Sequence, residues 1–218
     1  MRILFSGDSF TWGDELENNT EERFSRLVSQ HFDAEEINVS KCGNSNDTIL
    51  REIVGVSADI VITQWSVPSR YETFLKNQFL SVLPSDATNG PFATSNNTIR
   101  NLARQYYAHV QNKVIDHNNL WKNVMMADLL CDKMGALHVT VGLNRHDYMH
   151  ESTVFHGKRQ DLHFICPDII GEMRDEKTFC PDLMHIDKTK HGNHPNVEGH
   201  KLIANYLINQ IKILQKNA

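Results

Sequence analysis

The chain has 218 residues, and its 22 Lys and Arg against 27 Asp and Glu give a formal net charge of −5 at pH 7. This acidic balance argues against a general nucleic-acid binder, which needs a basic surface to displace counterions, and against attachment to membranes through polybasic segments. The length suits one α/β domain, so we expect residues 1–218 to form a single domain.

Strands and helices alternate along the sequence. Apolar or β-branched runs predict strands, and apolar residues at helical spacing predict helices. In chain order these are a strand at residues 2–6, a helix at 21–32, a strand at 35–39, a helix at 49–54 that Ser45 or Asn46 can cap, a strand at 59–65, a helix at 98–134 with a break near 116–119, strands at 136–142 and 162–166, and a helix at 196–216. Such alternation predicts a mostly parallel sheet with helices on both faces.

Two segments are expected to form loops that influence substrate choice. Residues 84–97 are rich in Ser, Asn, Thr, Gly and Pro, which is typical of a surface excursion, and a long loop spans residues 143–193 around the last predicted strand. No apolar run approaches the roughly 20 residues of a membrane-spanning helix, and the N-terminus has no signal-peptide pattern. The four cysteines are scattered, as free thiols in a reducing compartment often are, so we expect a cytoplasmic protein without membrane insertion.

A candidate nucleophile follows the first predicted strand. Gly7, Asp8 and Ser9 form a turn there, and such a turn can present a serine hydroxyl at the sheet edge. The hydroxyl becomes a useful nucleophile only when a base removes its proton. The G-x-S-x-G pattern of α/β-hydrolases is absent because position 11 is Thr. The alternative is a serine that only caps a turn or a short helix.

A candidate base stands just ahead of the last predicted helix. In the run His194, Pro195, Asn196, the proline stiffens the backbone beside the histidine and lets a helix begin at once. If that helix packs beside the first strand, His194 faces Ser9. The alternative is an ordinary histidine in a surface loop.

The order of three blocks along the chain resembles a divergent member of the SGNH (GDSL-type) hydrolases. The blocks lie at residues 7–9, 42–46 and 194–196. The resemblance implies a flavodoxin-like, three-layer α/β/α sandwich with about five parallel strands, and hydrolysis of esters by a serine without a metal or other cofactor. By position, it implies that Ser9 is the nucleophile, that the N–H groups of Ser9 and Gly43 stabilise the oxyanion, and that His194 is the general base.

The sequence departs from the family pattern at two points. A Gly-x-Asn-Asp block usually follows the third strand and supplies an oxyanion donor; here no Asn is present at residues 64–70, and Ser66 is the first substitute, with Gln64 and Asn44 as alternatives. The position three residues before the base, usually Asp, is His191. Asp187 is then the nearest candidate to orient His194, unless a backbone carbonyl does so and leaves a Ser–His dyad.

Several residues near these loops are candidates for a substrate pocket. Trp65 can wall an acyl or sugar pocket or pack in the core, and Arg70 can bind an anionic group through its forked donors or pair with Glu72 or Asp8. The full set of pocket candidates is Asp8, Asn44, Trp65, Arg70 and His191.

Nine of the twelve histidines lie at or after His138, which raises the alternative of a metal-dependent hydrolase. His191 and His194 have a spacing found in some zinc sites, but no complete metal motif is present, and we expect no bound metal. His138 is expected to be a satisfied sheet residue and His200 a buried, hydrogen-bonded helix residue.

The function expected from these residues is a serine ester hydrolase that acts on a small-molecule or carbohydrate ester, in particular O-acylated carbohydrate. Two alternatives remain open from the sequence. The missing Asn and Asp are compatible with a binding or structural protein that kept the fold and lost activity, and the C-terminal histidines with a metal-dependent hydrolase.

Overall fold

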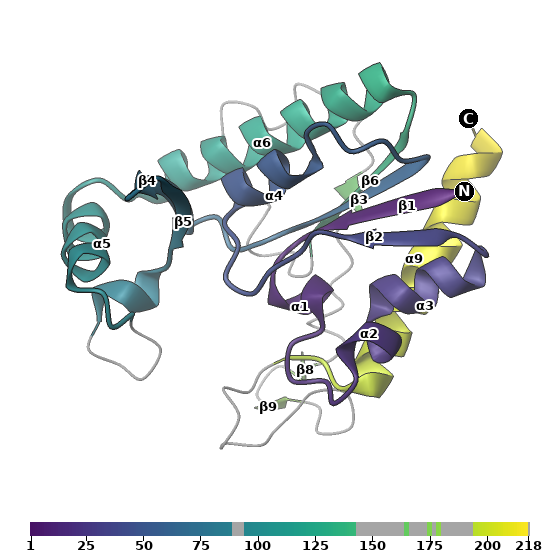
Figure 1. Cartoon of the computed structure of the whole chain (residues 1–218), viewed down its shortest axis with the longest axis horizontal. Coiled ribbons are helices and arrows are strands. Elements are labelled where there is room, and N and C mark those ends of the chain that lie inside the picture. The colour runs from purple at the N-terminus through teal and green to yellow at the C-terminus, as the bar shows by residue number, and fades with distance from the viewer. Residues whose placement is uncertain (89–93, 143–163, 166–173, 176–177, 180–193, 218) are drawn as a thin grey trace.

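The computed structural model describes residues 1–88, 94–142, 164–165, 174–175, 178–179 and 194–217. Its centre is a five-stranded sheet in which every pairing is parallel (Figure 1). The strands, in spatial order, are β2 (Glu35–Asn38), β1 (Arg2–Ser6), β3 (Ile60–Trp65), β6 (Leu137–Gly142) and β7 (Phe164–Ile165). Numbered within the sheet, this is the 2-1-3-4-5 order of the flavodoxin-like folds, which switches direction between β1 and β3.

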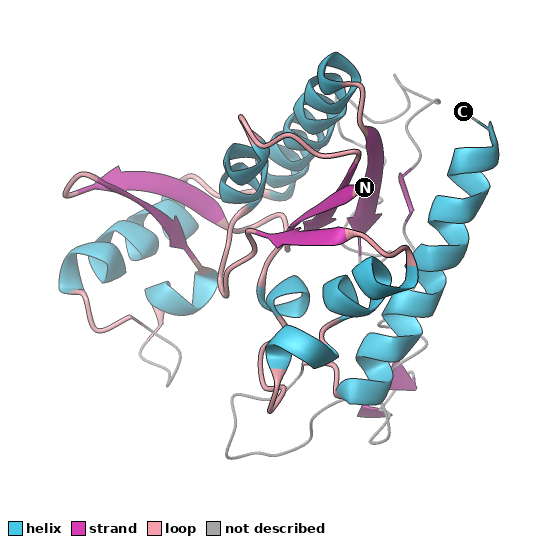
Figure 2. Ribbon diagram, turned by 45° about the vertical axis from the view of Figure 1, so that its right-hand side comes forward, coloured by secondary structure: helices cyan, strands magenta, loops and turns pink. Residues whose placement is uncertain are grey.

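Helices cover both faces of the sheet, which confirms the predicted three-layer α/β/α arrangement (Figure 2). Strand residues alternate between the two faces: Ile3 and Phe5 pack in one core cluster, whereas Leu4 packs in the other. The first cluster includes residues of α3 (Phe24–His31) and α9 (Val197–Asn217), and the second includes residues of α4 (Asn46–Ile53) and α6 (Lys113–Met134). None of the described helices is both long and apolar enough to cross a membrane.

The helix predicted at residues 21–32 is divided into α2 (Asn19–Glu22) and α3. Arg23 has extended backbone angles and separates the two helices. The N–H of Phe24 donates to Nδ1 of His200 at 3.1 Å, and the two rings stack. His200 is fully buried, as expected, and ties α9 to the beginning of α3.

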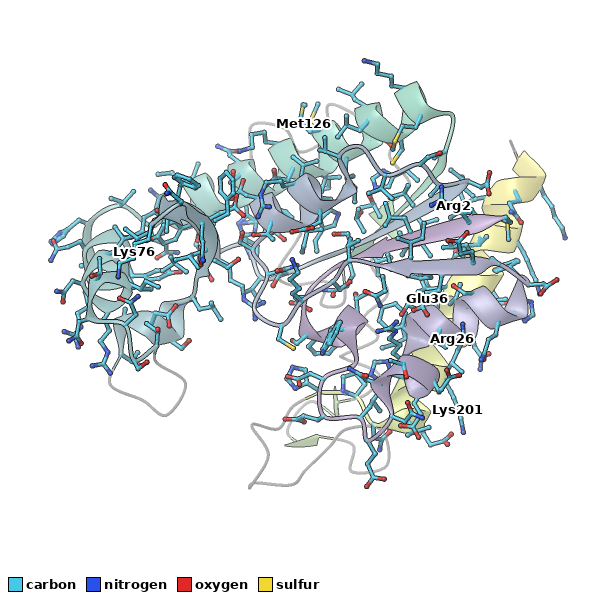
Figure 3. The ribbon with its side chains drawn as sticks, viewed as in Figure 1. Arg2, Arg26, Glu36, Lys76, Met126 and Lys201 are labelled. Atoms are coloured by element: carbon cyan, nitrogen blue, oxygen red, sulfur yellow. The ribbon has the colours of Figure 1, made fainter. Side chains whose placement is uncertain are left out.

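The excursion after β3 is larger and more ordered than the loop expected at residues 84–97. It begins with an antiparallel hairpin of β4 (Tyr71–Leu75) and β5 (Gln78–Val82), which is absent from the elements predicted from the sequence. Lys76 and Asn77 form its turn with positive φ angles, and Figure 3 labels Lys76 there. A 3₁₀ turn, η1 (Pro84–Ala87), and helix α5 (Asn97–His109) follow, beyond the carboxyl ends of the sheet strands (Figure 1).

The long helical segment predicted at residues 98–134 is interrupted earlier than expected. The break lies between α5 and α6, and not near residues 116–119, which are helical. Asn112 ends the break because its side chain accepts the N–H of Ile115 at 3.0 Å and so caps α6. Within residues 143–193 only β7 and the short pair β8 (Arg174–Asp175) and β9 (Thr178–Phe179) are described.

Candidate active site

The turn after β1 presents Ser9 at the carboxyl edge of the sheet. The side chain of Asp8 accepts the N–H of Phe10 at 3.1 Å and thereby caps α1 (Ser9–Trp12). A Cβ at position 7 would clash with the side chain of Thr11 and would lie 2.8 Å from Oε1 of Gln64, so only glycine fits at this position. The local sequence therefore forms a tight turn in which Ser9 is the first residue of a helix and is 6% exposed.

His194 contacts Ser9, although the two residues are 185 positions apart in the sequence. Its Nε2 lies 2.9 Å from Oγ of Ser9, within hydrogen-bond distance. Oδ1 of Asn196 accepts the N–H of Gly199 at 3.0 Å, as an N-cap side chain does, and so fixes the start of α9 directly after the histidine. The ring of Phe10 packs against the imidazole with 5.3 Å between centroids. The two residues expected to be nucleophile and base are thus brought together.

A buried polar network joins the loops after β1, β2 and β3. Oδ2 of Asp8 accepts two hydrogen bonds, one from Oγ of Ser66 at 2.7 Å and one from Nη1 of Arg70 at 3.1 Å. Arg70 also donates to the carbonyl of Asn44 at 3.3 Å, and Nδ2 of Asn44 donates to the carbonyl of Gly7 at 3.0 Å. The network fixes the three loops relative to one another, and Asp8 neutralises Arg70.

Several solved structures share the fold of this chain at low sequence identity. A GDSL-family putative lipolytic protein from Desulfitobacterium hafniense matches with a TM-score of 0.56 at 12% identity, over 95% of this chain and 98% of its own. The psychrotrophic esterase EstA from a Pseudoalteromonas species matches with a TM-score of 0.57 at 13% identity, over 99% and 98%. The chain has the SGNH-hydrolase fold. No protein-family model matches the sequence, and no curated protein is significantly similar to it.

A third structure with the SGNH fold is an acetyl xylan esterase, Est2A, from the rumen bacterium Butyrivibrio proteoclasticus. It matches with a TM-score of 0.51 at 10% identity, over 99% of this chain and 64% of its own. At identities this low, the structural similarity establishes the shared fold alone, and the chemistry depends on the residues of the site.

Two residues expected at the SGNH-type site have other roles in the structure. Trp65 is fully buried in the core cluster beneath α4 and α6, so it packs the core and does not wall a pocket. The single hydroxyl proton of Ser66 is donated to Asp8, which does not suit Ser66 as an oxyanion donor. Gly43 lies in the loop after β2 with φ of 80°, a conformation that residues with a Cβ adopt only with strain.

Two carboxylates from the turn after α1 lie beside His194. Oε1 of Glu15 is 3.5 Å from Nδ1, and Oδ2 of Asp14 is 3.9 Å from Nε2. Neither residue is predicted from the sequence, because the family pattern places the partner of the base shortly before the histidine. Those candidates, Asp187 and His191, lie outside the described residues.

Cys42, in the loop after β2, has a thiol that is held in its protonated form. Desolvation, together with smaller contributions from the nearby carboxylates of Asp14 and Asp8, raises the pKa of this thiol to about 12. A thiol with so high a pKa is a poor nucleophile at neutral pH, so Cys42 does not compete with Ser9 for that role.

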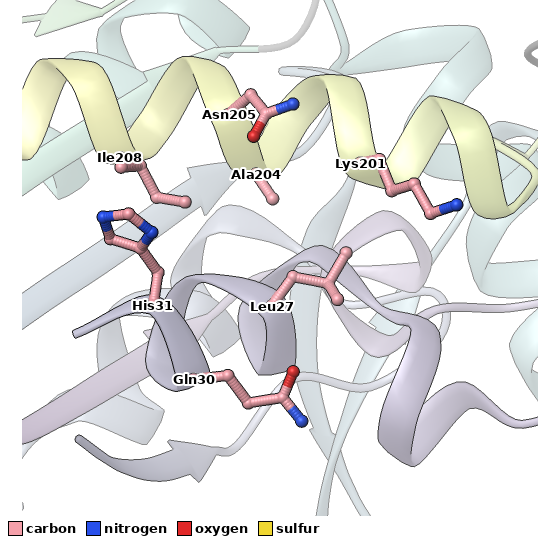
Figure 4. Close-up of a pocket in the computed structure, with 7 residues that line it drawn as sticks. All are labelled: Leu27, Gln30, His31, Lys201, Ala204, Asn205 and Ile208. Atoms are coloured by element: carbon pink, nitrogen blue, oxygen red, sulfur yellow. The ribbon is translucent and has the colours of Figure 1, made fainter. Parts of the chain in front are cut away.

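The described residues contain no candidate metal centre, and they form a pocket that lies apart from the candidate active site. Six of the nine histidines from His138 onward lie outside the described residues. No group of three or more His, Cys, Asp or Glu side chains that could hold a metal ion occurs among the described residues. A pocket of about 480 Å³ does lie between α3 and α9 (Figure 4). Its lining residues include Leu27, Gln30, His31, Lys201, Ala204 and Asn205. Neither Ser9 nor His194 lines it, so it is distinct from the candidate active site.

Proposed function

We propose that this protein is a serine ester hydrolase in which Ser9 is the nucleophile and His194 the general base. The observation that carries the proposal is the 2.9 Å contact between Oγ of Ser9 and Nε2 of His194. It occurs at the carboxyl ends of parallel strands in an SGNH fold, where open α/β sheets place their sites. A serine beside a histidine base is the arrangement that nucleophilic catalysis of acyl transfer requires.

The proposed reaction has two acyl-transfer steps. Oγ of Ser9 donates its proton to Nε2 of His194 and attacks the acyl carbon of the ester, which forms a tetrahedral intermediate. The imidazolium then protonates the leaving alcohol as the C–O bond breaks, and the acyl group remains on Ser9. His194 next takes a proton from water, the water attacks the acyl-serine, and the carboxylic acid leaves as Oγ of Ser9 recovers its proton. The serine supplies the nucleophile, so these steps need no metal.

The oxyanion of the tetrahedral intermediate needs preorganised donors. We assign this role to the backbone N–H groups of Ser9 and Gly43, by position in the SGNH fold. Ser66, whose hydroxyl is already donated to Asp8, is better suited to hold the Asp8 carboxylate beside the nucleophile turn. Loss of one oxyanion donor slows other serine hydrolases by roughly 10²–10³-fold, so two donors predict an enzyme of modest rate.

The proposed substrates are short acyl esters, in particular O-acetyl groups on carbohydrate. The support is the presence of an acetyl xylan esterase among the structures with this fold. A fold shared at low identity is an analogy, so the substrate class needs a direct assay.

The proposed function is tested by hydrolysis of p-nitrophenyl acetate and butyrate and of acetylated xylo-oligosaccharides. Ser9→Ala is expected to lower kcat by about 10⁴–10⁶-fold, because the nucleophile is lost. Ser57→Ala is the matched control, since Ser57 is an exposed serine away from the site. Activity that is equal in wild type and Ser9→Ala contradicts the assignment of Ser9 as the nucleophile. Activity that is absent from both proteins on every ester contradicts the proposal and favours a binding protein. Activity lost on treatment with a chelator and restored by a metal favours the metal-dependent alternative.

A further inference from the structure

We propose that Glu15 orients His194, as the third member of a Ser9–His194–Glu15 triad. This inference rests on the proposed function and extends it to the residue that supports the base. The imidazole presents Nε2 to Ser9 at 2.9 Å, and on its other side Nδ1 lies 3.5 Å from Oε1 of Glu15. The three side chains therefore stand in the order nucleophile, base and carboxylate.

The burial of both side chains supports this pairing. The side chain of Glu15 is 6% exposed and that of His194 is 17% exposed. Neither carboxylate oxygen of Glu15, nor Nδ1 of His194, has a hydrogen bond within the part of the chain that the structure describes. A buried carboxylate without a partner is costly, and these unsatisfied atoms face one another. A small rotation of either side chain closes the 3.5 Å separation, and catalytic hydrogen bonds are commonly long in unliganded enzymes.

The backbone around Glu15 is held in an uncommon conformation that directs this side chain. Glu15 has φ of 69°, in the left-handed region that non-glycine residues seldom adopt. The preceding turn is fixed by the N–H groups of Gly13 and Asp14, which both donate to the carbonyl of Ser9 at 3.0 Å. The N–H of Glu15 itself donates to Oδ1 of Asp14 at 3.2 Å. The nucleophile and its proposed supporting carboxylate thus lie on the same short turn, six positions apart in sequence.

The proposed role of Glu15 is to keep the proton of neutral His194 on Nδ1. Nδ1–H then donates to the carboxylate, which leaves Nε2 free to accept the proton of Ser9 and stabilises the imidazolium that forms. Asp14 does not suit this role, because its carboxylate approaches Nε2 at 3.9 Å and its side chain is 40% exposed. Glu15 is therefore a positioning residue that acts through His194.

The kinetic arm of the test compares three variants. Glu15→Gln keeps the shape of the side chain and removes its charge, and we expect kcat to fall by about 10²–10⁴-fold with KM changed by less than about threefold. Glu15→Asp keeps the charge, and we expect it to restore part of kcat. Glu17→Gln is the matched control, because Glu17 is an exposed carboxylate two residues along the same segment, and we expect its kcat to equal that of wild type.

A second arm does not depend on activity. A histidine Nδ1–H that is donated to a buried carboxylate gives a proton NMR resonance well downfield of the amide region, and the His194→Asn variant assigns it by its loss. We expect this resonance in wild type and Glu17→Gln, and expect Glu15→Gln to lose it. A wild type without the resonance, or a Glu15→Gln variant that keeps the resonance or full kcat, overturns the proposal. If wild type hydrolyses no ester but shows the Glu15-dependent resonance, the proposed function fails and the pairing stands.

Discussion

A serine and a histidine in contact form a catalytic pair only when the histidine nitrogen that faces the serine carries no proton. For Nε2 of His194 to accept the proton of Ser9, the proton of the neutral imidazole must lie on Nδ1, and Glu15 is the carboxylate beside that nitrogen. Ser9 and His194 could be predicted from the sequence because each lies in a recognisable block beside a strand or a helix. The position of Glu15 could not be predicted in this way, because it depends on a left-handed backbone angle that no local pattern of residues indicates.

At the same scale, the environment of Cys42 predicts slow alkylation. Desolvation, with the added influence of Asp14 and Asp8, raises the pKa of the thiol to about 12, so the thiolate fraction below that pH is small. At pH 8 we expect iodoacetamide to modify Cys42 about 100-fold more slowly in the folded protein than in urea. The rate should rise with pH up to about 12.

Peptide mapping by mass spectrometry measures this rate for Cys42 separately from the other cysteines. The Asp14→Asn variant should react faster than wild type, because one of the carboxylates that disfavours the thiolate is neutralised. Equal rates of alkylation in folded and unfolded protein at pH 8 would show that the thiol is not held in its protonated form.

At the scale of elements, the turn between β1 and α1 determines whether Ser9 reaches His194. Gly7→Ala places a Cβ against Thr11 and 2.8 Å from Oε1 of Gln64, both of which are buried. We expect this variant to lose about 1–3 kcal/mol of unfolding free energy and most of its esterase activity, because the turn must shift. Urea denaturation and the p-nitrophenyl acetate assay measure the two effects.

Gly55→Ala separates the effect of this close packing from an ordinary glycine effect. Gly55 has φ of 81°, but a Cβ there meets nothing within 4 Å. We expect a loss of about 1 kcal/mol from backbone strain and unchanged kcat. A Gly7→Ala variant that is as active as Gly55→Ala would show that the turn tolerates displacement.

The elements differ in how much of them could be predicted. The strands β1, β3 and β6 carry runs of apolar or β-branched residues. Ser45 caps α4 as expected, with its Oγ 3.3 Å from the backbone nitrogen of Thr48. The β4–β5 hairpin is not predicted from the sequence, because it packs on a small cluster of its own around Val82 and Ile99, outside the main sheet. The break between α5 and α6 lies earlier than the apolar pattern predicts, because it depends on the cap at Asn112 and not on the spacing of apolar residues.

At the scale of the whole molecule, the parallel sheet brings four distant segments to one edge. The loops after β1, β2 and β3 are tied together through Asp8, and the start of α9 adds His194 from the far end of the chain. This convergence follows from the 2-1-3-4-5 strand order, which places β1 at the centre of the site. The sequence supports this arrangement through alternation of strands and helices, whereas the hydrogen bonds that fix the loops emerge only from the structure.

The most direct test of the Ser9–His194 pair is covalent labelling with a fluorophosphonate. The esterase EstA with the same fold was solved inhibited by monoethylphosphonate, which makes a phosphonate a suitable probe. We expect one adduct per molecule by intact mass, located on Ser9 by peptide mapping. It should be absent from Ser9→Ala, strongly slowed in His194→Asn, and unchanged in Ser57→Ala. A wild type that remains unlabelled, or a Ser9→Ala variant that is labelled as fast as wild type, would contradict the assignment of Ser9 as an activated nucleophile.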